Sequence, residues 1–577
     1  MNNQEHETDV LVIGGGIAGT FAAIKAREAG AAEVVQVDKA SVGRSGCSAF
    51  AAGVIQAFSP DEDDREDCFR EAVIKSHFLC DQEKLEDHLD DSADRIKEMD
   101  SLGVEFVKTA QGKLQRQVGR GKFTSIMFHG GYQMMEAMRR AASRTGVKLV
   151  DRVMIVDLLT DGGRIAGAIG FNTDSGEVHE FMAKSVVLAA GRTWLKTRRP
   201  GHRNLSGDGI AAAYRAGLTL TGFDSGGVNT GPAMYDIGPG NNMYMGSGAT
   251  LVNADGERFV EKYDPVLKER TELHTLSAAC AIEAKRGKTP LYLDMTHIEP
   301  EKVRLMRRVI PSPMMMWERA GVLAGDRFTR KIEWVTEGPS VRGGLLVNRR
   351  YETTLPGLFA CGDAMPSSGT WGQNALAGAM TSGARAGKHA AEYAREVSPP
   401  EADAEQISEL KRQMLEPLLR KDGIEPDQVL LSLQEAVMPY DVWTLRSEER
   451  MSRALKEIES IWRDQVPLLK AYDPHYLRMA VEARNLALVS LLLLKSSLFR
   501  QESRETARED YPYMDNINWL KWVTVKKEGE QISTSAVEVP LHRYKLKPEK
   551  GKDLHPIWRV AERQGIIRIE GERVKWA

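Results

Sequence analysis

The first forty residues alternate between apolar runs and polar turns in the order strand, helix, strand. One run ends at Ile13 and is followed by Gly14-x-Gly16-x-x-Gly19, and a second run ends at Asp38. Gly14 allows a tight turn, Gly16 allows the backbone to approach a pyrophosphate, and Gly19 lets the helix pack on the strand. Asp38 closes the second strand, where a carboxylate can accept both hydroxyls of an adenosine ribose. The pattern predicts a site for the ADP half of a dinucleotide.

Farther along, the chain divides into stretches of strand-like and helix-like periodicity. Helical spacing fills 61–104, strand-like runs lie at 149–159, 164–171 and 180–191, and a strand followed by glycine returns at 355–363. Between these stretches, residues 232–340 are rich in Met, Pro and Tyr and indicate an insert. Amphipathic helix follows from about 401 to 500, and the chain from residue 513 is basic and turn-rich.

These stretches predict an α/β fold with a Rossmann-like nucleotide-binding domain, an inserted α+β capping domain and a C-terminal helical domain. We expect the nucleotide-binding domain at 1–231 and 344–396, the cap at 232–343, the helical domain at 401–512 and a C-terminal extension at 513–577. A cap over the site would shield a buried cofactor from water.

Several strand ends indicate that the dinucleotide is FAD. In Leu358 to Asp363 the acid after the strand can accept hydrogen bonds from a ribityl chain, which only flavins carry. A helix opening near Gly372 can stabilise negative charge on the flavin ring. Val186 to Gly191 ends a strand in small residues, which suits a ligand or simply a tight turn. Asp208 caps a helix, contacts the cofactor, or does both.

Composition excludes several classes of protein. The chain has 577 residues, enough for two to four domains, and a net charge of −3 that disfavours nucleic-acid binding. The N-terminus is polar and acidic, and the longest apolar run, Leu486 to Leu494, is too short for a membrane span, so we expect a cytoplasmic protein. The five cysteines form no C-x-x-C pair, which predicts no metal or iron–sulfur cluster bound by this chain.

With these motifs in place, the chain resembles the flavoprotein subunits of the succinate dehydrogenase/fumarate reductase superfamily, and looks closest to the adenylylsulfate reductase alpha subunit. The carriers are Gly14 to Gly19, Arg44-Ser45-Gly46, Met127 to Gly130, Asp255 to Phe259, Leu291 to His297, Gly357 to Asp363, Glu502-Ser-Arg504, Arg508 to Pro512 and Trp519. The resemblance implies FAD, a capping domain, a C-terminal helical bundle, and an iron–sulfur partner in a hetero-oligomer.

Together the motifs and the resemblance imply a set of FAD-binding residues. They are Gly14, Gly16, Ile17, Ala18, Gly19, Asp38, Lys39, Ala40, Arg44, Ser45, Gly46, Cys47, Ala52, Gly53, Met154, Ala190, Gly191, Asp208, Gly362, Asp363, Asn374, Ala379 and Met380. Some members of the family join FAD covalently to a histidine after Arg-Ser. Here Gly46 and Cys47 follow, so we expect non-covalent FAD, with Cys47 as a small side chain near the flavin rather than a thioether.

The substrate residues of known family members are missing. Leu276 stands where the proton-donating arginine is expected, and Ala375 stands where a clamp arginine is expected. Trp371 replaces a histidine of the same loop, and the His-Pro-Thr-Gly string is reduced to Asn229-Thr-Gly231. A dicarboxylate would lack bidentate donors in such a pocket, so fumarate reduction is not expected. The chain also departs from the adenylylsulfate reductase pattern, because Gln56 stands in place of an asparagine and Pro339 or Ser340 in place of a histidine.

Four polar residues remain as catalytic candidates, each with a structural alternative. Arg342 could bind an anionic substrate or be an interdomain arginine, and Glu261 could relay protons or lie on the surface of the cap. His129 and His274 could act near the flavin or be satisfied, partly buried imidazoles. Gln373 and Asn374 are also polar and expected close to the flavin.

Three hypotheses follow. In the first, the chain is the catalytic subunit of an FAD-dependent oxidoreductase that exchanges a hydride with a small anionic substrate and relays electrons to an iron–sulfur partner, around which the basic tail 526–577 could wrap. In the second it is a stand-alone oxidase or reductase resembling L-aspartate oxidase. In the third it is an FAD-binding RNA-modification or scaffold protein, which the net charge disfavours.

Overall fold

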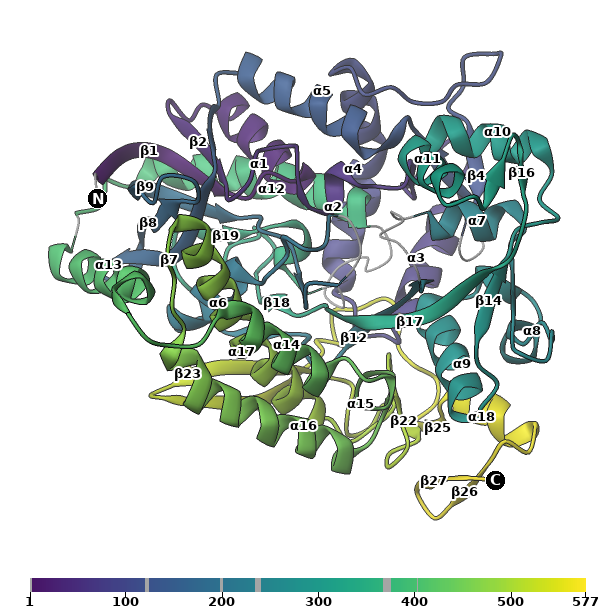
Figure 1. Cartoon of the computed structure of the whole chain (residues 1–577). Coiled ribbons are helices and arrows are strands. Elements are labelled where there is room, and N and C mark those ends of the chain that lie inside the picture. Colours follow the sequence, from purple (N-terminus) through teal and green to yellow (C-terminus); the bar gives the residue numbers. More distant parts are fainter. Residues whose placement is uncertain (1–2, 120–123, 198–200, 234–239, 367–374, 402) are drawn as a thin grey trace.

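The computed structural model describes the chain except for residues 1–2, 120–123, 198–200, 234–239, 367–374 and 402 (Figure 1). It opens with the expected unit of β1 (Asn3–Ile13), α1 (Ile17–Glu28) and β2 (Val34–Asp38). β1 pairs in parallel with β2 on one side and with β9 (Val178–Leu188) on the other. The apolar residues of β1 from Val10 to Ile13 are buried, as expected for a central parallel strand.

The principal sheet has seven strands in the order β6-β2-β1-β9-β8-β7, with β19 paired in parallel to β9. The remaining strands are β6 (Lys148–Asp151), β7 (Val153–Asp161), β8 (Arg164–Asn172) and β19 (Leu358–Ala360). In Figure 1, α1 and α12 (Ala375–Glu396) lie above this sheet, while α6 (Asp208–Arg215) and α17 (Pro474–Phe499) lie below it. Gly383 and Gly387 of α12 meet α1 closely, because an added Cβ would lie 2.3 and 2.0 Å from the carbonyl oxygens of Ala18 and Ala22.

A second core belongs to the inserted part of the chain. Its five-stranded sheet has the order β10-β17-β14-β13, with β12 paired to β17. The strands are β10 (Thr193–Trp194), β12 (Gly226–Pro232), β13 (Thr250–Val252), β14 (Leu291–Asp294) and β17 (Ile332–Val341), and the helices are α7 (Asn241–Ser247), α8 (Val260–Tyr263), α9 (Leu273–Lys285), α10 (Pro300–Val309) and α11 (Pro311–Arg319). Two further helices, α3 (Arg65–Lys75) and α4 (Gln82–Ser101), follow strand β3 (Val54–Ile55). In a small three-stranded sheet, β5 (Thr124–Met127) lies between β3 and β4 (Arg116–Val118) and pairs with both.

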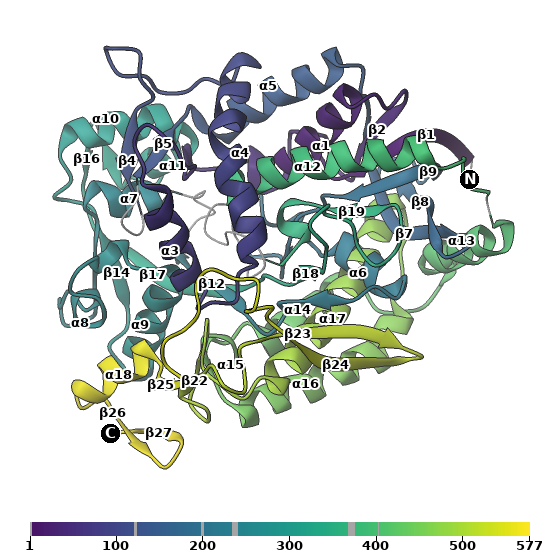
Figure 2. The ribbon, with the colours of Figure 1, turned by 180° about the vertical axis from the view of Figure 1, so that it is seen from behind.

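The helical part comprises α13 (Ala404–Leu419), α14 (Pro426–Val437), α16 (Glu448–Ser460) and α17. The segment after residue 513 is divided between two neighbours. Its hairpin of β23 (Lys521–Glu528) and β24 (Gln531–Glu538) joins β11 (Leu220–Thr221) and β18 (Gly344–Leu345) in one sheet. Its end, with α18 (Pro556–Arg563), β26 (Ile567–Glu570) and β27 (Arg573–Trp576), packs into the core of the insert near α8 and α9 (Figure 2).

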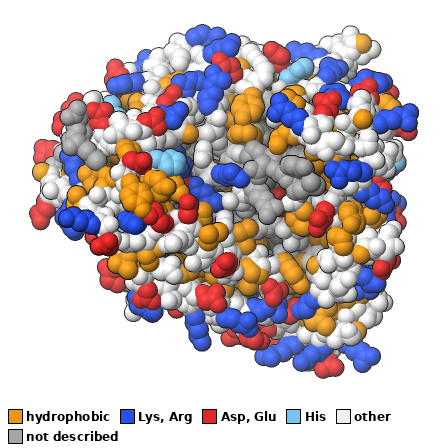
Figure 3. All heavy atoms as spheres, in the orientation of Figure 1, with side chains coloured by type: hydrophobic (Ala, Val, Ile, Leu, Met, Phe, Trp, Pro, Cys, Tyr) orange, Lys and Arg blue, Asp and Glu red, His pale blue; other side chains and the backbone are white. Residues whose placement is uncertain are grey.

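The fold confirms the predicted mixed α/β class. Within the part of the chain that the structure describes, no helix is both long and apolar enough to cross a bilayer. On the face in Figure 3, Lys and Arg side chains are interspersed with Asp and Glu.

Candidate functional site

The glycine turn between β1 and α1 brings three backbones close together. Gly14 has a φ of +123°, and a Cβ added there would lie 2.3 Å from the Ala189 carbonyl oxygen. A Cβ on Gly19 would lie 2.1 Å from the Gly14 carbonyl oxygen, so α1 sits directly against the turn. Side chains at these positions would push α1 and β9 apart.

Asp38 is held at the end of β2 by two backbone amides. The amides of Gly15 and Ala40 each donate to its carboxylate at 2.8 Å. Burial raises the pKa of Asp38, although the two amides act in the opposite direction. The carboxylate is therefore fixed in the wall beside the glycine turn, where it can accept further hydrogen bonds.

A cavity of about 420 Å³ runs from Asp38 across the glycine turn to Asp363 and the start of α12. Its lining contains most of the predicted cofactor residues: Gly14, Gly16, Ile17, Ala18, Asp38, Lys39, Ser45, Gly46, Cys47, Ala52, Met154, Ala190, Gly191, Asp208, Asp363 and Ala379. The elements that meet here are β1, β2, β9, α1, α6, α12 and α2 (Gly46–Ala49). Residues more than three hundred positions apart thus share one elongated space.

Six predicted cofactor residues lie behind the lining or away from it: Gly19, Ala40, Arg44, Gly53, Gly362 and Met380. Gly19 provides helix packing, and Ala40 supports Asp38 through its amide. Arg44 is half-exposed and pairs with Glu136, while Met380 is fully buried in the core. Asn374 is outside the described residues, as are Gln373 and Trp371.

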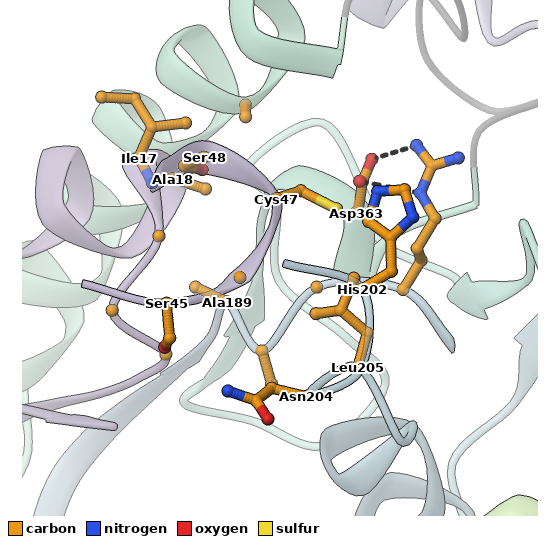
Figure 4. Close-up of a pocket in the computed structure, with 18 of the residues that line it drawn as sticks. Ile17, Ala18, Ser45, Cys47, Ser48, Ala189, His202, Asn204, Leu205 and Asp363 are labelled. Carbon is orange, nitrogen blue, oxygen red and sulfur yellow. Dashed lines mark hydrogen bonds and ion pairs between the residues drawn. The ribbon is translucent and has the colours of Figure 1, made fainter. Parts of the chain in front are cut away.

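The far end of the cavity contains an ion pair that the sequence pattern did not predict. Arg192, which directly follows Gly191, donates Nε and Nη2 to the two oxygens of Asp363 at 2.8 and 2.7 Å. Figure 4 shows this pair with dashed lines, beside Cys47 and His202. The His202 ring stacks on Trp194 with centroids 4.1 Å apart, and both line the cavity. A polar residue directly after a glycine-ended strand was the available signal for Arg192.

Arg342 lies behind this end of the cavity, in a second buried cluster. Its Nη1 is 3.7 Å from Oε2 of Glu505, and its Nε has no hydrogen-bond partner among the described atoms. Burial lowers the pKa of Arg342 and raises the pKa of Glu505. The nearby charges of Arg192 and Asp363 also act on Arg342, so the two clusters are neighbours.

Three histidines extend the second cluster. The His77 ring meets the His274 and His555 rings edge-on, at centroid distances of 5.4 and 5.9 Å. Burial lowers the pKa of His274 to about 4 and that of His555 to about 3, and it also lowers the pKa of His77. All three rings are therefore neutral near pH 7. A very small cavity lies between His274, His555 and Glu505.

The other two catalytic candidates lie elsewhere. Glu261 is partly exposed on the insert, where it pairs with Arg258 and Lys268. His129 precedes α5 (Gly130–Arg144) and does not line the cavity. Leu276 is fully buried on α9, while Gln56 and Asn229 do line the cavity. The structure therefore groups Arg342 with His274 and separates both from Glu261.

Two protein families match the chain. The FAD binding domain family matches residues 9–380, and the fumarate reductase flavoprotein C-terminal family matches residues 432–552. The chain is an FAD-dependent oxidoreductase of the succinate dehydrogenase/fumarate reductase family. This confirms the family predicted from the motifs. The cofactor of the flavoprotein is FAD, and Gly46 in the place of a linking histidine predicts that it is bound non-covalently.

Relatives of this flavoprotein cover nearly its whole length. It is 28% identical over 559 residues to a subunit of the fumarate reductase (CoM/CoB) of Methanothermobacter marburgensis, covering 92% of this chain and 99% of that protein. It is 26% identical over 554 residues to the L-aspartate oxidase of Streptomyces coelicolor, with 90% and 91% covered. The structure of adenylylsulfate reductase from Archaeoglobus fulgidus aligns with a TM-score of 0.79 at 23% identity, covering 94% of this chain and 98% of that one, which shows a shared fold.

The shape and donors of the cavity fit FAD. An extended dinucleotide needs a close approach to backbone, which Gly14 and Gly16 permit, and a helix N-terminus that favours a phosphate, which α1 provides. The Ile17 amide at this N-terminus donates to Ser48 Oγ at 3.1 Å. It also needs an acid for the ribose, supplied by Asp38, at the opposite end from Asp363.

Proposed function

We propose that this flavoprotein transfers a hydride between FAD and a small anionic substrate and passes the electrons to an iron–sulfur protein. FAD supplies the hydride-accepting and hydride-donating ring when it is bound. The protein's own residues orient the cofactor, bind the anion, hold a proton and exclude water. The partly buried arginines Arg192 and Arg342 carry the proposal, because they flank the paired residues Thr193 and Val341, where the insert joins the nucleotide-binding sheet.

The lining suggests which way FAD lies. Asp38 suits the adenosine ribose, the glycine turn and the start of α1 suit the pyrophosphate, and Cys47, Asp363 and Ala379 would then face the flavin end. The start of α12 adds a helix N-terminus at this end, which favours negative charge on a reduced ring. We assign the remaining predicted lining residues to the same ligand.

Charge at the flavin end favours an anionic substrate. Arg192 is fully matched by Asp363, whereas Arg342 is only loosely matched by Glu505 at 3.7 Å. Burial raises the pKa of Glu505 and lowers the pKa of Arg342, so the charged forms of both groups carry a burial cost that their 3.7 Å contact only partly offsets. A carboxylate or oxyanion placed against Arg342 would offset the cost for this arginine. Glu505 and His274 are then the neighbouring groups able to hold a proton.

Sequence similarity to a subunit of a larger enzyme supports the iron–sulfur partner. The relative from Methanothermobacter marburgensis is named as one subunit of a fumarate reductase, so a protein similar over nearly the whole chain works within a multi-subunit enzyme. This sequence contains no C-x-x-C pair with which to build a conventional cluster. The stand-alone alternative rests on the L-aspartate oxidase of Streptomyces coelicolor, which is nearly as similar.

Anaerobic titration of the purified holoprotein with small carboxylate and oxyanion donors tests the substrate class. One such donor should bleach the flavin band of the wild type. Arg342→Gln should lower kcat/KM for it about 100-fold or more, because a buried cation that meets the charge is lost. FAD affinity should stay within about twofold. Arg330→Gln, on the exposed surface of the insert, is the matched control and should change nothing.

Equal bleaching rates in Arg342→Gln and the wild type would show that Arg342 does not bind the substrate anion. For the partner, an iron–sulfur protein should co-purify and reoxidise the reduced flavoprotein faster than oxygen does. Rapid reoxidation by oxygen, with no such protein bound, would favour the stand-alone oxidase.

A further inference from the structure

The wall of the cavity at the ADP end is backed by helix α17 of the helical domain. Two cavity-lining residues, Lys39 after β2 and Asp208 at the start of α6, are each bonded to this helix. Lys39 Nζ donates to Glu482 Oε1 at 2.8 Å, and Asn485 Nδ2 donates to Asp208 Oδ1 at 3.0 Å. Glu482 and Asn485 are three residues apart and so lie on one face of the helix.

All three hydrogen-bond donors of the Lys39 ammonium are in use. Besides Glu482 it donates to Ser206 Oγ at 2.6 Å and to Asp208 Oδ2 at 2.7 Å, so its three donors have three acceptors. Two of these acceptors, Ser206 and Asp208, lie just before and at the start of α6, and the third comes from a helix more than 270 residues later in the chain. Without Glu482, the ammonium would keep partners on one side only.

Glu482 is unusual for a carboxylate because only 1% of its side chain is exposed. It is surrounded by three cations, Lys39, Lys196 and Arg478. Burial alone would raise its pKa, but these cations hold the pKa of Glu482 well below the usual value. Asp208 also pairs with Lys39, and of the three cations only Lys39 lines the cavity.

We propose that Glu482 is a positioning residue for FAD, which fixes Lys39 and Asp208 at the ADP end and makes the helical domain part of the cofactor site. The proposal rests on the placement of FAD in this cavity. Glu482 does not line the cavity, so it acts through Lys39. A lysine that lines the cavity and is held rigid from behind suits the diphosphate of the dinucleotide.

A double-mutant cycle on FAD affinity tests the proposal. Apoprotein of the wild type, Glu482→Gln, Lys39→Met and the double variant is titrated with FAD, and quenching of FAD fluorescence gives Kd. Glu482→Gln should weaken binding at least about tenfold, because a buried charge pair loses one partner. Lys39→Met should weaken it comparably. In the double variant the two losses should not add, since both act through one contact.

Arg478→Gln is the matched control. Arg478 lies one turn before Glu482 and contacts the same carboxylate at 2.8 Å, but it does not line the cavity. If Glu482 acts through Lys39, this variant should keep FAD Kd within about twofold of the wild type. If the effect is only a loosened α17, Arg478→Gln should lose FAD as Glu482→Gln does, and the proposal is overturned.

Two further outcomes separate this proposal from the cofactor placement. Wild-type affinity in Glu482→Gln with weakened binding in Lys39→Met would overturn the role of Glu482 alone. Wild-type affinity in both would overturn the placement of the ADP end itself. Should Glu482→Gln fail to fold, Glu482→Asp keeps the charge but withdraws it by one methylene. It should bind FAD less tightly than the wild type, and unchanged binding would count against the proposal.

Discussion

The two ends of the cavity are built on opposite principles. At the ADP end, Lys39, Asp208 and Glu482 satisfy one another with short hydrogen bonds. Behind the flavin end, in a cluster that does not line the cavity, Arg342 and Glu505 are 3.7 Å apart, and Arg342 Nε and Glu505 Oε2 have no hydrogen-bond partner among the described atoms. Buried polar groups in folded proteins are nearly always paired, so an unpaired set marks a place prepared for a ligand, a water or a proton. We call the ADP end, with its paired groups, the matched end, and the flavin end, with the unpaired groups behind it, the unmatched end. The matched end is expected to retain the cofactor, and the chemistry is expected at the unmatched end.

The largest effect should come from filling the glycine turn. Gly19→Ala places a Cβ 2.1 Å from the Gly14 carbonyl oxygen, so α1 must move. Overpacking of this kind should cost about 3 kcal/mol of unfolding free energy in the apoprotein and abolish FAD retention. Gly378→Ala, also in a helix but with open space around its Cβ, is the control for denaturant unfolding and should be neutral or slightly stabilising. Equal unfolding free energies for the two variants would contradict the packing argument.

Removing the acid of the matched end should have the next largest effect. Asp38→Asn replaces one acceptor oxygen by a donor that faces the Gly15 or Ala40 amide. We expect a loss of FAD affinity of about 2 kcal/mol, or roughly 30-fold, by calorimetry on apoprotein. Asp174→Asn, which removes an exposed ion pair with Arg152, should leave Kd unchanged. A Kd for Asp38→Asn equal to that of the wild type would place the ribose elsewhere.

The histidines behind the unmatched end should make the fold sensitive to acid. His274 and His555 have pKa values lowered by burial to about 4 and about 3, so the unfolded chain binds more protons between these values and about 6.5. Their contribution is complete above pH 6.5 and is lost as the pH falls. Each should add a slope of about 1.4 kcal/mol per pH unit within that window.

His555→Asn should remove the contribution of one titrating histidine from this dependence of unfolding free energy on pH. Neutral His555 donates Nε2–H to the Arg504 carbonyl oxygen and accepts the Ile557 amide at Nδ1, which caps α18. Asparagine can preserve the cap but does not titrate. Denaturant unfolding from pH 4.5 to 6.5 measures the slope, and an unchanged slope would show that His555 is not the buried neutral group described.

The smallest effect is expected at Glu261. It is partly exposed and pairs with Arg258 and Lys268, and none of the three lines the cavity. Glu261→Gln should therefore leave FAD affinity and turnover unchanged, with His274→Gln assayed in parallel as a variant expected to lower turnover. A strong loss of turnover in Glu261→Gln alone would indicate that protons reach the site through Glu261 on the surface of the insert.

The sequence predicted the matched end better than the unmatched one. Strand, glycine turn, helix and acid are local signals, so the roles of Gly14, Gly19 and Asp38 could be predicted from spacing. The contacts of Arg192 with Asp363 and of Glu505 with Arg342 could not, because each joins residues far apart in the sequence that only the folded sheet and the packed C-terminal segment bring together. The same holds for Glu482, whose partner Lys39 is more than 440 positions away. The family resemblance pointed to residues that this chain replaces, such as Leu276, and gave no indication of what replaces them.

Competition by the two halves of the cofactor shows which end of the cavity supplies the affinity for FAD. Apoprotein is loaded with a sub-saturating amount of FAD and titrated with ADP or with FMN, and release is followed by FAD fluorescence. Because the matched donors lie at the Asp38 end, ADP should displace FAD at a much lower concentration than FMN does. Displacement by FMN with no effect of ADP would contradict the account, since affinity would then reside at the flavin end.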